Sequence, residues 1–153
     1  MRAVEPWVEG PLAAFVAESS ARVALLMTSA GQVVAQYGFT RSLDVMAAAA
    51  LGAGIVASTR ELARELRAGS FGAIAHQGPH VGVFLAPFAM PEGDWVGLVV
   101  FGPDTSLGMV KLFFGRMVEQ LGQAAPREPV AREILAETFE DELNASLRAL
   151  FGR

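Results

Sequence analysis

The chain has 153 residues, of which 52% are hydrophobic and 18% charged, and its formal net charge is −4. This length fits one domain with a buried core, and the composition excludes an intrinsically disordered chain. The twelve basic residues are spread along the chain rather than clustered, so nucleic-acid binding is not expected. The sequence contains no cysteine, which excludes disulfides, thiolate metal sites and cysteine nucleophiles.

The sequence predicts a cytoplasmic protein without a membrane span. The longest apolar stretch, residues 45–57, consists mostly of alanine and glycine and is shorter than the roughly 20 residues that cross a bilayer. The N-terminal segment MRAVEPWVEGP has glutamates and prolines where a secretory signal would have an apolar run. The high apolar content instead favours a surface that is buried against another chain.

The first half of the chain predicts a helix, a β-hairpin and a long helix. Residues 11–21 form the first helix, opened by a proline, and residues 22–29 and 32–38 read as two strands joined by an Ala-Gly turn. The long helix is expected to run from an N-cap at Ser42 to Arg67, because the intervening residues contain no proline and end in the strong helix former RELARELR.

The second half predicts three strands and a further helix. The strands cover residues 70–77, 81–88 and 95–102, with a loop at 90–94, and a helix follows at 105–122. The apolar positions of that helix recur at helical spacing: Leu107, Val110, Phe114, Met117, Val118 and Leu121. The order helix, two strands, helix, three strands, helix predicts an α+β sandwich with a five-stranded antiparallel sheet.

The end of the chain predicts a separate helical extension. We expect a domain at 11–122, a proline-containing linker at 123–129 and an amphipathic helix at 130–151. The apolar face of this helix begins at Leu135 and continues through Phe139, Leu143, Leu147, Leu150 and Phe151; its acidic residues are Glu137, Glu140, Asp141 and Glu142. Such a stripe needs a receiving groove, which can belong either to the chain's own domain or to a partner.

The stretch AAALGAGIVAS at residues 48–58 contains a degenerate form of the glycine spacing that binds a dinucleotide. That fingerprint requires a strand to end at the first glycine and a helix to start there. Here both glycines lie inside a helix, where the backbone N–H groups are already hydrogen-bonded. A nucleotide site is therefore not expected, and no other cofactor is indicated.

Two faces are predicted for the long helix. The larger apolar residues share one face and are expected to pack on the sheet; they are Leu51, Ile55, Leu62 and Leu66. A second stripe consists of small residues, Ala47, Ala50, Gly54 and Ala57, with Ala53 at its margin. The internal glycines cost about 1 kcal/mol each relative to alanine. The small stripe is therefore expected to accept a closely packed helix, either of the same chain or of another.

No catalytic or metal site is expected. His76 and His80 flank a tight turn without a third ligand or a carboxylate nearby in sequence. Asp104 and Asp44 are explained as residues at helix N-termini. Ser58 has no neighbouring base and no nucleophile elbow around it.

Four segments together resemble the roadblock (dynein light chain roadblock) domain family. They are ALLMTSAGQVVAQ, STRELARELR, AIAHQGPHVGVFLAP and WVGLVVFGPDTSLGMVKLFFGRM, and the resemblance covers about residues 11–121. Within this family, the HQG turn at 76–78, the LGMVKL segment at 107–112 and the C-terminal extension are similar to bacterial gliding-motility and cell-polarity regulators of the MglB type.

The resemblance implies a homodimer that binds a small Ras-like GTPase and stimulates its GTP hydrolysis without being an enzyme itself. The long helices of two subunits would pair on one side of a continuous sheet that is joined through the third strand, and the GTPase would bind across them. A non-catalytic scaffold that anchors or localises its partner is the alternative. A weaker one is a small-molecule sensor with a pocket lined by Phe84, Leu98 and Phe101.

The resemblance also implies site residues. The small GTPase-contacting positions of the family fall on Ala53 and Ala57, and the whole expected GTPase surface is Ala50, Ala53, Gly54, Ala57, Arg60, Glu61 and Arg64. The expected dimer interface is Ala47, Ala50, Gly54, Phe71, Ala73 and Ala75. Arg41, Arg60 and Arg64 lie near this surface as candidates for an arginine finger, or else as solvated charges paired with nearby glutamates.

Overall fold

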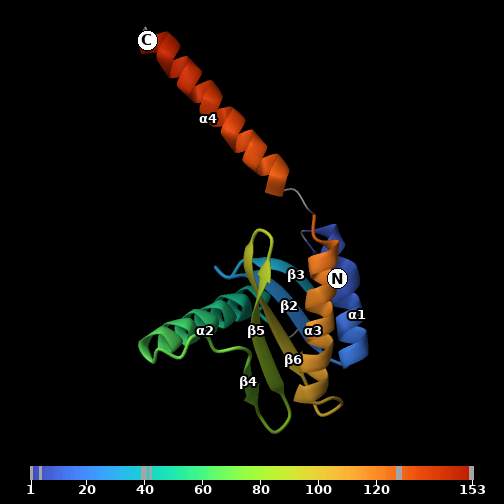
Figure 1. Cartoon of the computed structure of the whole chain (residues 1–153). Coiled ribbons are helices and arrows are strands. Elements are labelled where there is room, and N and C mark those ends of the chain that lie inside the picture. Colours follow the sequence, from blue (N-terminus) through green and yellow to red (C-terminus); the bar gives the residue numbers. More distant parts are fainter. Residues whose placement is uncertain (1, 4, 39–40, 42, 127–128, 152–153) are drawn as a thin grey trace.

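A computed structural model describes residues 2–3, 5–38, 41, 43–126 and 129–151. One antiparallel sheet forms the centre, with strand order β1-β3-β2-β6-β5-β4 and helices on both faces (Figure 1). Its strands are β1 (Arg2–Ala3), β2 (Val23–Thr28), β3 (Val33–Gly38), β4 (Ile74–Gln77), β5 (Gly82–Met90) and β6 (Gly93–Phe101). The helices are η1 (Pro6–Val8), α1 (Glu9–Ser19), α2 (Val45–Glu65), α3 (Leu107–Ala124) and α4 (Pro129–Phe151).

The predicted order of elements is confirmed, with one addition. The five predicted strands form the sheet, and β1 adds a short sixth strand, in which Arg2 pairs with Gln36 of β3. The loop predicted at 90–94 is shorter than expected, because β5 and β6 continue until Met90 pairs with Gly93. The resulting β5–β6 hairpin projects beyond the rest of the sheet (Figure 1).

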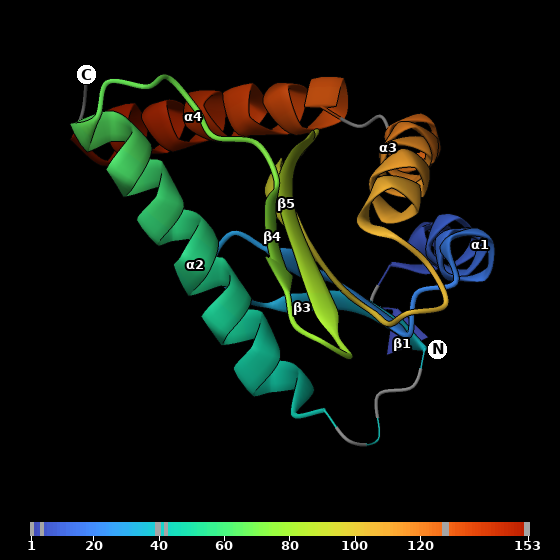
Figure 2. The ribbon, with the colours of Figure 1, turned by 90° about the horizontal axis from the view of Figure 1, so that it is seen from below.

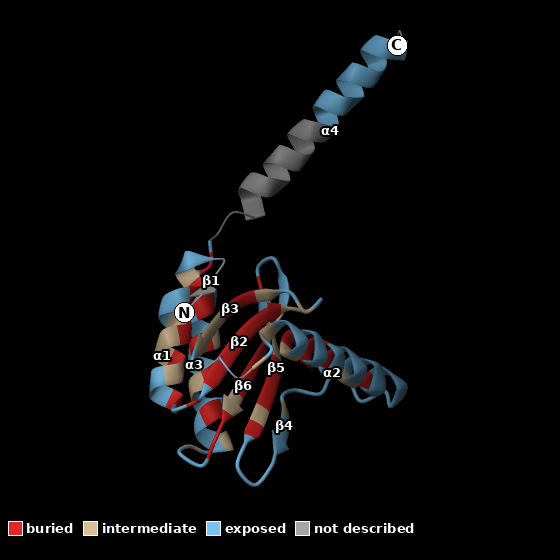
Figure 3. Ribbon diagram, turned by 180° about the vertical axis from the view of Figure 1, so that it is seen from behind, coloured by how far each residue is buried: buried red, intermediate tan, exposed pale blue. Residues whose placement is uncertain are grey.

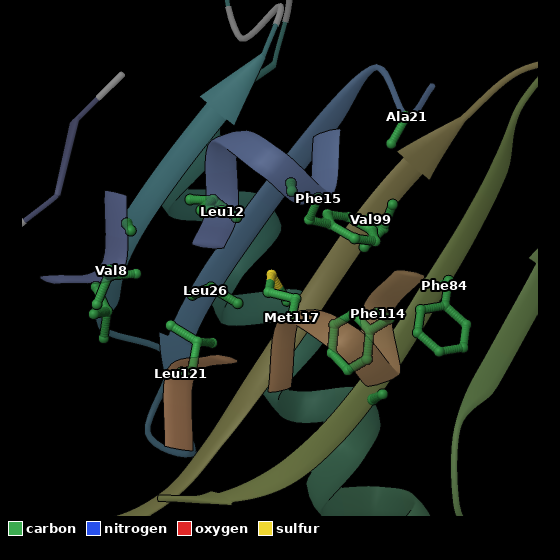
Figure 4. Close-up of a cluster of buried hydrophobic side chains, with 14 of the residues drawn as sticks. Val8, Leu12, Phe15, Ala21, Leu26, Phe84, Val99, Phe114, Met117 and Leu121 are labelled. Carbon is green, nitrogen blue, oxygen red and sulfur yellow. The ribbon is translucent and has the colours of Figure 1, made fainter. Parts of the chain in front are cut away.

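The helices divide into two layers. α1 and α3 pack on one face of the sheet and α2 packs alone on the other, as the view in Figure 2 shows. The α1/α3 layer covers the larger core, where Leu12, Phe15, Met117 and Leu121 are buried together (Figure 4). Phe114 meets Phe15, Phe84 and Phe88 edge-to-face. The apolar spacing of the α3 sequence therefore identified its buried face correctly.

Side-chain caps fix where the two central helices begin. Asp44 accepts a hydrogen bond from the Ala47 N–H at 3.1 Å and is the N-cap of α2. Ser106 accepts one from the Met109 N–H at 3.3 Å and caps α3. The expected α2 cap, Ser42, lies outside the described residues, and the helix starts after Asp44. Both residue types are good caps, so sequence alone could not choose between positions two residues apart.

The C-terminal helix is present as α4. It extends away from the sheet in Figure 1, and residues 140–151 are exposed (Figure 3). The predicted docking residues Leu143, Leu147, Leu150 and Phe151 are among the exposed large apolar side chains. The side chain of Phe139 lies outside the described part of the chain.

Candidate functional site

The side of α2 that contacts the sheet is made of small residues. Ala49, Gly52, Ala53, Val56 and Ala63 are its buried positions. A Cβ added at Gly52 would lie 3.0 Å from Leu98 Cδ1 and 3.2 Å from Leu85 Cδ2, which is tighter than ordinary packing. Gly52 therefore allows the helix to approach its own sheet closely, and its low helix propensity is offset there.

The larger apolar residues of α2 face away from the sheet. Leu51, Leu62 and Leu66 are 69%, 54% and 61% exposed, and Ile55 is 38% exposed. The prediction that these four residues pack on the sheet is wrong. The sheet's own side chains, including Leu25, Met27, Leu85 and Leu98, fill the space beneath α2, so only small helix residues fit there.

The predicted stripe of small residues lies on the exposed side. Ala47, Ala50, Gly54 and Ala57 are exposed, and among the described residues nothing lies within 4 Å of a Cβ built on Gly54. These four residues, together with Leu51, Ile55, Leu62 and Leu66, form what we call the outer face of α2. Ala53 is not part of it: its exposed fraction is 7%, so the expected contact between Ala53 and a partner is not available.

Two ion pairs hold the arginines at the C-terminal half of α2. Arg60 Nη2 lies 3.2 Å from Asp94 Oδ2, which belongs to β6, and Arg64 Nη1 lies 2.7 Å from Glu61 Oε1. All four side chains are partly exposed, so each pair contributes little to stability. Arg41, the third candidate arginine, is exposed and lies before the start of α2.

A groove of about 320 Å³ runs beside these arginines. The C-terminal half of α2, the connection to β4 and one residue of β5 line it: Val56, Thr59, Arg60, Ala63, Arg64, Gly69, Ser70, Phe71, Gly72, Ile74 and Pro87. Its floor is apolar and its rim is basic. Sequence reasoning missed this groove, because it depends on how the connection folds back beside the helix.

The remaining predicted interface residues lie at one edge of the sheet. β4 is the last strand in the order and is hydrogen-bonded to β5 on one side. Phe71, Ala73 and Ala75 are exposed there, Phe71 with 43% of its surface. An edge strand with exposed backbone groups is a template for pairing with another chain.

The other candidates do not come together as a site. His76 and His80 are exposed, and within the described ranges no three His, Cys, Asp or Glu residues are grouped as metal ligands. The expected sensor pocket is wrong: Phe84 and Phe101 face the α1/α3 layer and Leu98 faces α2. Because these three side chains lie on opposite faces of the sheet, they cannot line one cavity.

α2 is also the helix in the described part of the chain that is long and apolar enough to cross a membrane, by length and composition alone. The expectation that this stretch is too short is therefore wrong, since the apolar character continues beyond Ala57. The same test is passed by helices that pack on a protein core, and α2 packs on the sheet through its small residues.

Comparison with known proteins points to one fold. No protein-family model and no curated protein matches the sequence. Among solved structures, MglB of Myxococcus xanthus is 24% identical, with a TM-score of 0.71 over 78% of this chain and 95% of that one. The gliding protein MglB of Thermus thermophilus is 29% identical, with a TM-score of 0.68 over 78% of this chain and 88% of that one.

Two further structures bear on family and assembly. A roadblock/LC7 domain from Streptomyces avermitilis is 15% identical, with a TM-score of 0.63 over 72% of this chain and 91% of that one. An MglB structure described as a tetrameric arrangement is 28% identical, with a TM-score of 0.68 over 77% of this chain and 87% of that one. The chain is thus a roadblock-fold protein, similar in structure to the MglB gliding proteins.

Proposed function

We propose that the protein is a homodimeric regulator that binds a small Ras-like GTPase on the outer face of α2 and stimulates its GTP hydrolysis. The observation that carries this proposal is the outer face itself, which is apolar, small-residued and exposed along a whole helix. Exposed apolar surface of this extent is typical of protein–protein contacts. The proposal places the protein in the cytoplasm, in a process related to gliding motility or cell polarity.

Dimerisation would use the leucine side of the outer face and the β4 edge. Leu51, Leu62 and Leu66 are each more than half exposed, and burying such side chains is favourable by about 1.5–3 kcal/mol each. Phe71, Ala73 and Ala75 continue this apolar surface along the connection and the edge strand. Pairing of β4 with β4 of a second copy would join the two sheets and bring the two α2 helices together.

The GTPase would bind the small-residue side of the outer face. Ala50, Gly54 and Ala57 present no bulk, so the backbone of a partner can approach closely. Arg60, Glu61 and Arg64 follow at the C-terminal half and supply polar contacts at the rim. Ala53 is left out because it is buried against the sheet.

Activation would proceed by repositioning groups of the GTPase rather than by an arginine finger. Arg60 and Arg64 are both held by carboxylates of this chain, which is unlike a finger that is free to enter a partner's active site. Replacing either by alanine should therefore change the stimulated rate by less than about tenfold, whereas losing a true finger costs about 10³-fold or more. Single-turnover GTP hydrolysis measures the difference.

Ala57→Arg tests the binding surface. A long charged side chain on the small-residue stripe should abolish GTPase binding, and the dimer should remain intact because Ala57 lies on the opposite side of the stripe from the leucines. Pull-down of the GTPase and light scattering of the variant read out both properties. Ala17→Arg, on the exposed surface of α1, is the matched control and should bind normally. Normal binding by Ala57→Arg would remove the proposed surface.

A scaffold without activating function is the second candidate. It is favoured by the same observation on Arg60 and Arg64, since both guanidinium groups are already engaged within the chain. A scaffold and an activator share the interface but differ in one measurement. The activator accelerates single-turnover hydrolysis of GTP by the partner, and the scaffold leaves that rate unchanged.

A further inference from the structure

The groove at the C-terminal half of α2 combines an apolar floor with a basic rim. Val56 and Ala63 are 3% and 2% exposed and form part of the floor. The guanidinium groups of Arg60 and Arg64 lie at the rim. A ligand that fits this chemistry carries an apolar side chain flanked by carboxylates. We propose that the occupant is the acidic middle of this chain's own α4, docked in cis.

The sequence of α4 has the complementary pattern. Phe139 lies within the segment ETFEDEL, which has four carboxylates at residues 137–142. At about 100° per residue, Glu140 and Glu142 fall on either side of Phe139 on the helix. An aromatic side chain would therefore enter the apolar part of the groove while a carboxylate on each side reaches an arginine.

The point where α4 is attached allows this docking. Ala125 and Pro126, at the end of α3, share a small pocket with Pro91 and Glu92 in the β5–β6 turn. The same hairpin supplies Asp94, which contacts Arg60. The chain thus leaves the domain beside the hairpin that touches the groove. From Pro129 to Glu140 a helix rises about 16 Å, enough to bring the acidic segment over the C-terminal half of α2.

Both surfaces lack a better partner within the described residues. The ion pairs of Arg60 and Arg64 are exposed to solvent, so exchanging them for carboxylates of α4 costs little. Leu143, Leu147 and Leu150 are exposed on α4, and an isolated helix of this length is marginal in water. Docking covers apolar surface on both elements at once.

Docking in cis would make α4 a competitor for the partner surface. Arg60 and Arg64 belong both to the groove and to the proposed GTPase contact, so α4 and the GTPase could not occupy them together. This regulatory consequence rests on the proposed function. The docking itself does not, because it concerns contacts within one chain.

Disulfide trapping tests the docking in the full chain. Since the sequence contains no cysteine, the variant pair Ser70→Cys and Glu140→Cys places one thiol at the groove and one on α4. We expect an intrachain disulfide to form about tenfold faster than in the control pair Ala17→Cys and Glu140→Cys, because docking raises the effective concentration of the thiols. Equal rates, or interchain disulfides alone, would overturn the proposal.

Charge reversal tests the basic rim. Arg64→Glu should slow trapping of Ser70→Cys with Glu140→Cys by about fivefold, and adding Glu142→Arg should restore the rate, because opposite charges face each other again. Trapping that ignores Arg64→Glu would contradict the proposed electrostatic match. Circular dichroism of each variant establishes that α4 and the domain remain folded.

The regulatory consequence is measured separately. Phe139→Asp should abolish trapping and tighten GTPase binding about threefold, since the docked fraction no longer lowers the apparent affinity. If trapping succeeds but no variant binds a GTPase, the docking stands and the proposed function fails. If Phe139→Asp abolishes trapping without changing GTPase affinity, α4 does not compete and the regulatory part is wrong.

Discussion

The two sides of α2 carry similar residue types for different reasons. Gly52 lies on the side that contacts the sheet, where a Cβ would press on Leu98 and Leu85. Gly54, two residues later, lies on the outer face, where a Cβ would meet nothing within 4 Å among the described residues. A run of small residues in a sequence can therefore serve the chain's own core on one side of a helix and leave an open surface on the other.

The largest expected effect comes from filling the inner side. Gly52→Leu forces a branched side chain between α2 and the sheet, and we expect the free energy of unfolding to fall by about 2 kcal/mol, as in other overpacked cores. Gly54→Leu is the matched control and should change it by less than about 0.5 kcal/mol. Urea unfolding followed by circular dichroism measures both. A Gly52→Leu protein as stable as the parent would mean that α2 lies further from the sheet.

A smaller effect is expected when the leucine side of the outer face is charged. Leu62→Glu should weaken self-association about tenfold, which corresponds to about 1.4 kcal/mol, because a carboxylate would be buried between subunits. Leu112→Glu on α3 is the control, since Leu112 is 51% exposed and Leu62 is 54% exposed. Sedimentation equilibrium gives the two dissociation constants, and equal values would show that α2 does not form the dimer interface.

The smallest effect is expected at Gly54. Gly54→Ala adds helix propensity at an open position and should raise the free energy of unfolding by about 1 kcal/mol or less. The same urea experiment without a partner measures it. A destabilised variant would instead reveal that the backbone of another chain already lies against Gly54.

The sequence predicted the elements more completely than their orientation. Breakers and apolar spacing placed the five main strands and four helices, and the spacing on α3 also identified its buried side, since only one side of α3 is apolar. On α2 both sides are apolar. Leu51 and Leu62 looked like core residues because of their size, but the free space above the sheet admits only residues like Ala49 and Gly52. That space is set by strands distant in sequence.

The candidate site was predicted in part for the same reason. Ala50, Gly54 and Ala57 were identified as a small-residue stripe, and they are exposed. The burial of Ala53 could not be anticipated, because it lies near the boundary between the two sides of the helix. The groove beside Arg60 and Arg64 had no local signal, since its walls come from α2, β5 and the segment that leads to β4.

The position of the two tryptophans has a practical consequence. Trp7 and Trp95 stack with ring centroids 5.8 Å apart, and the sequence contains no other tryptophan. Both line the small pocket that Pro126 closes at the end of α3. The near-ultraviolet emission of the unlabelled protein therefore originates beside the root of α4, and the protein carries its own optical reporter for movement at that joint.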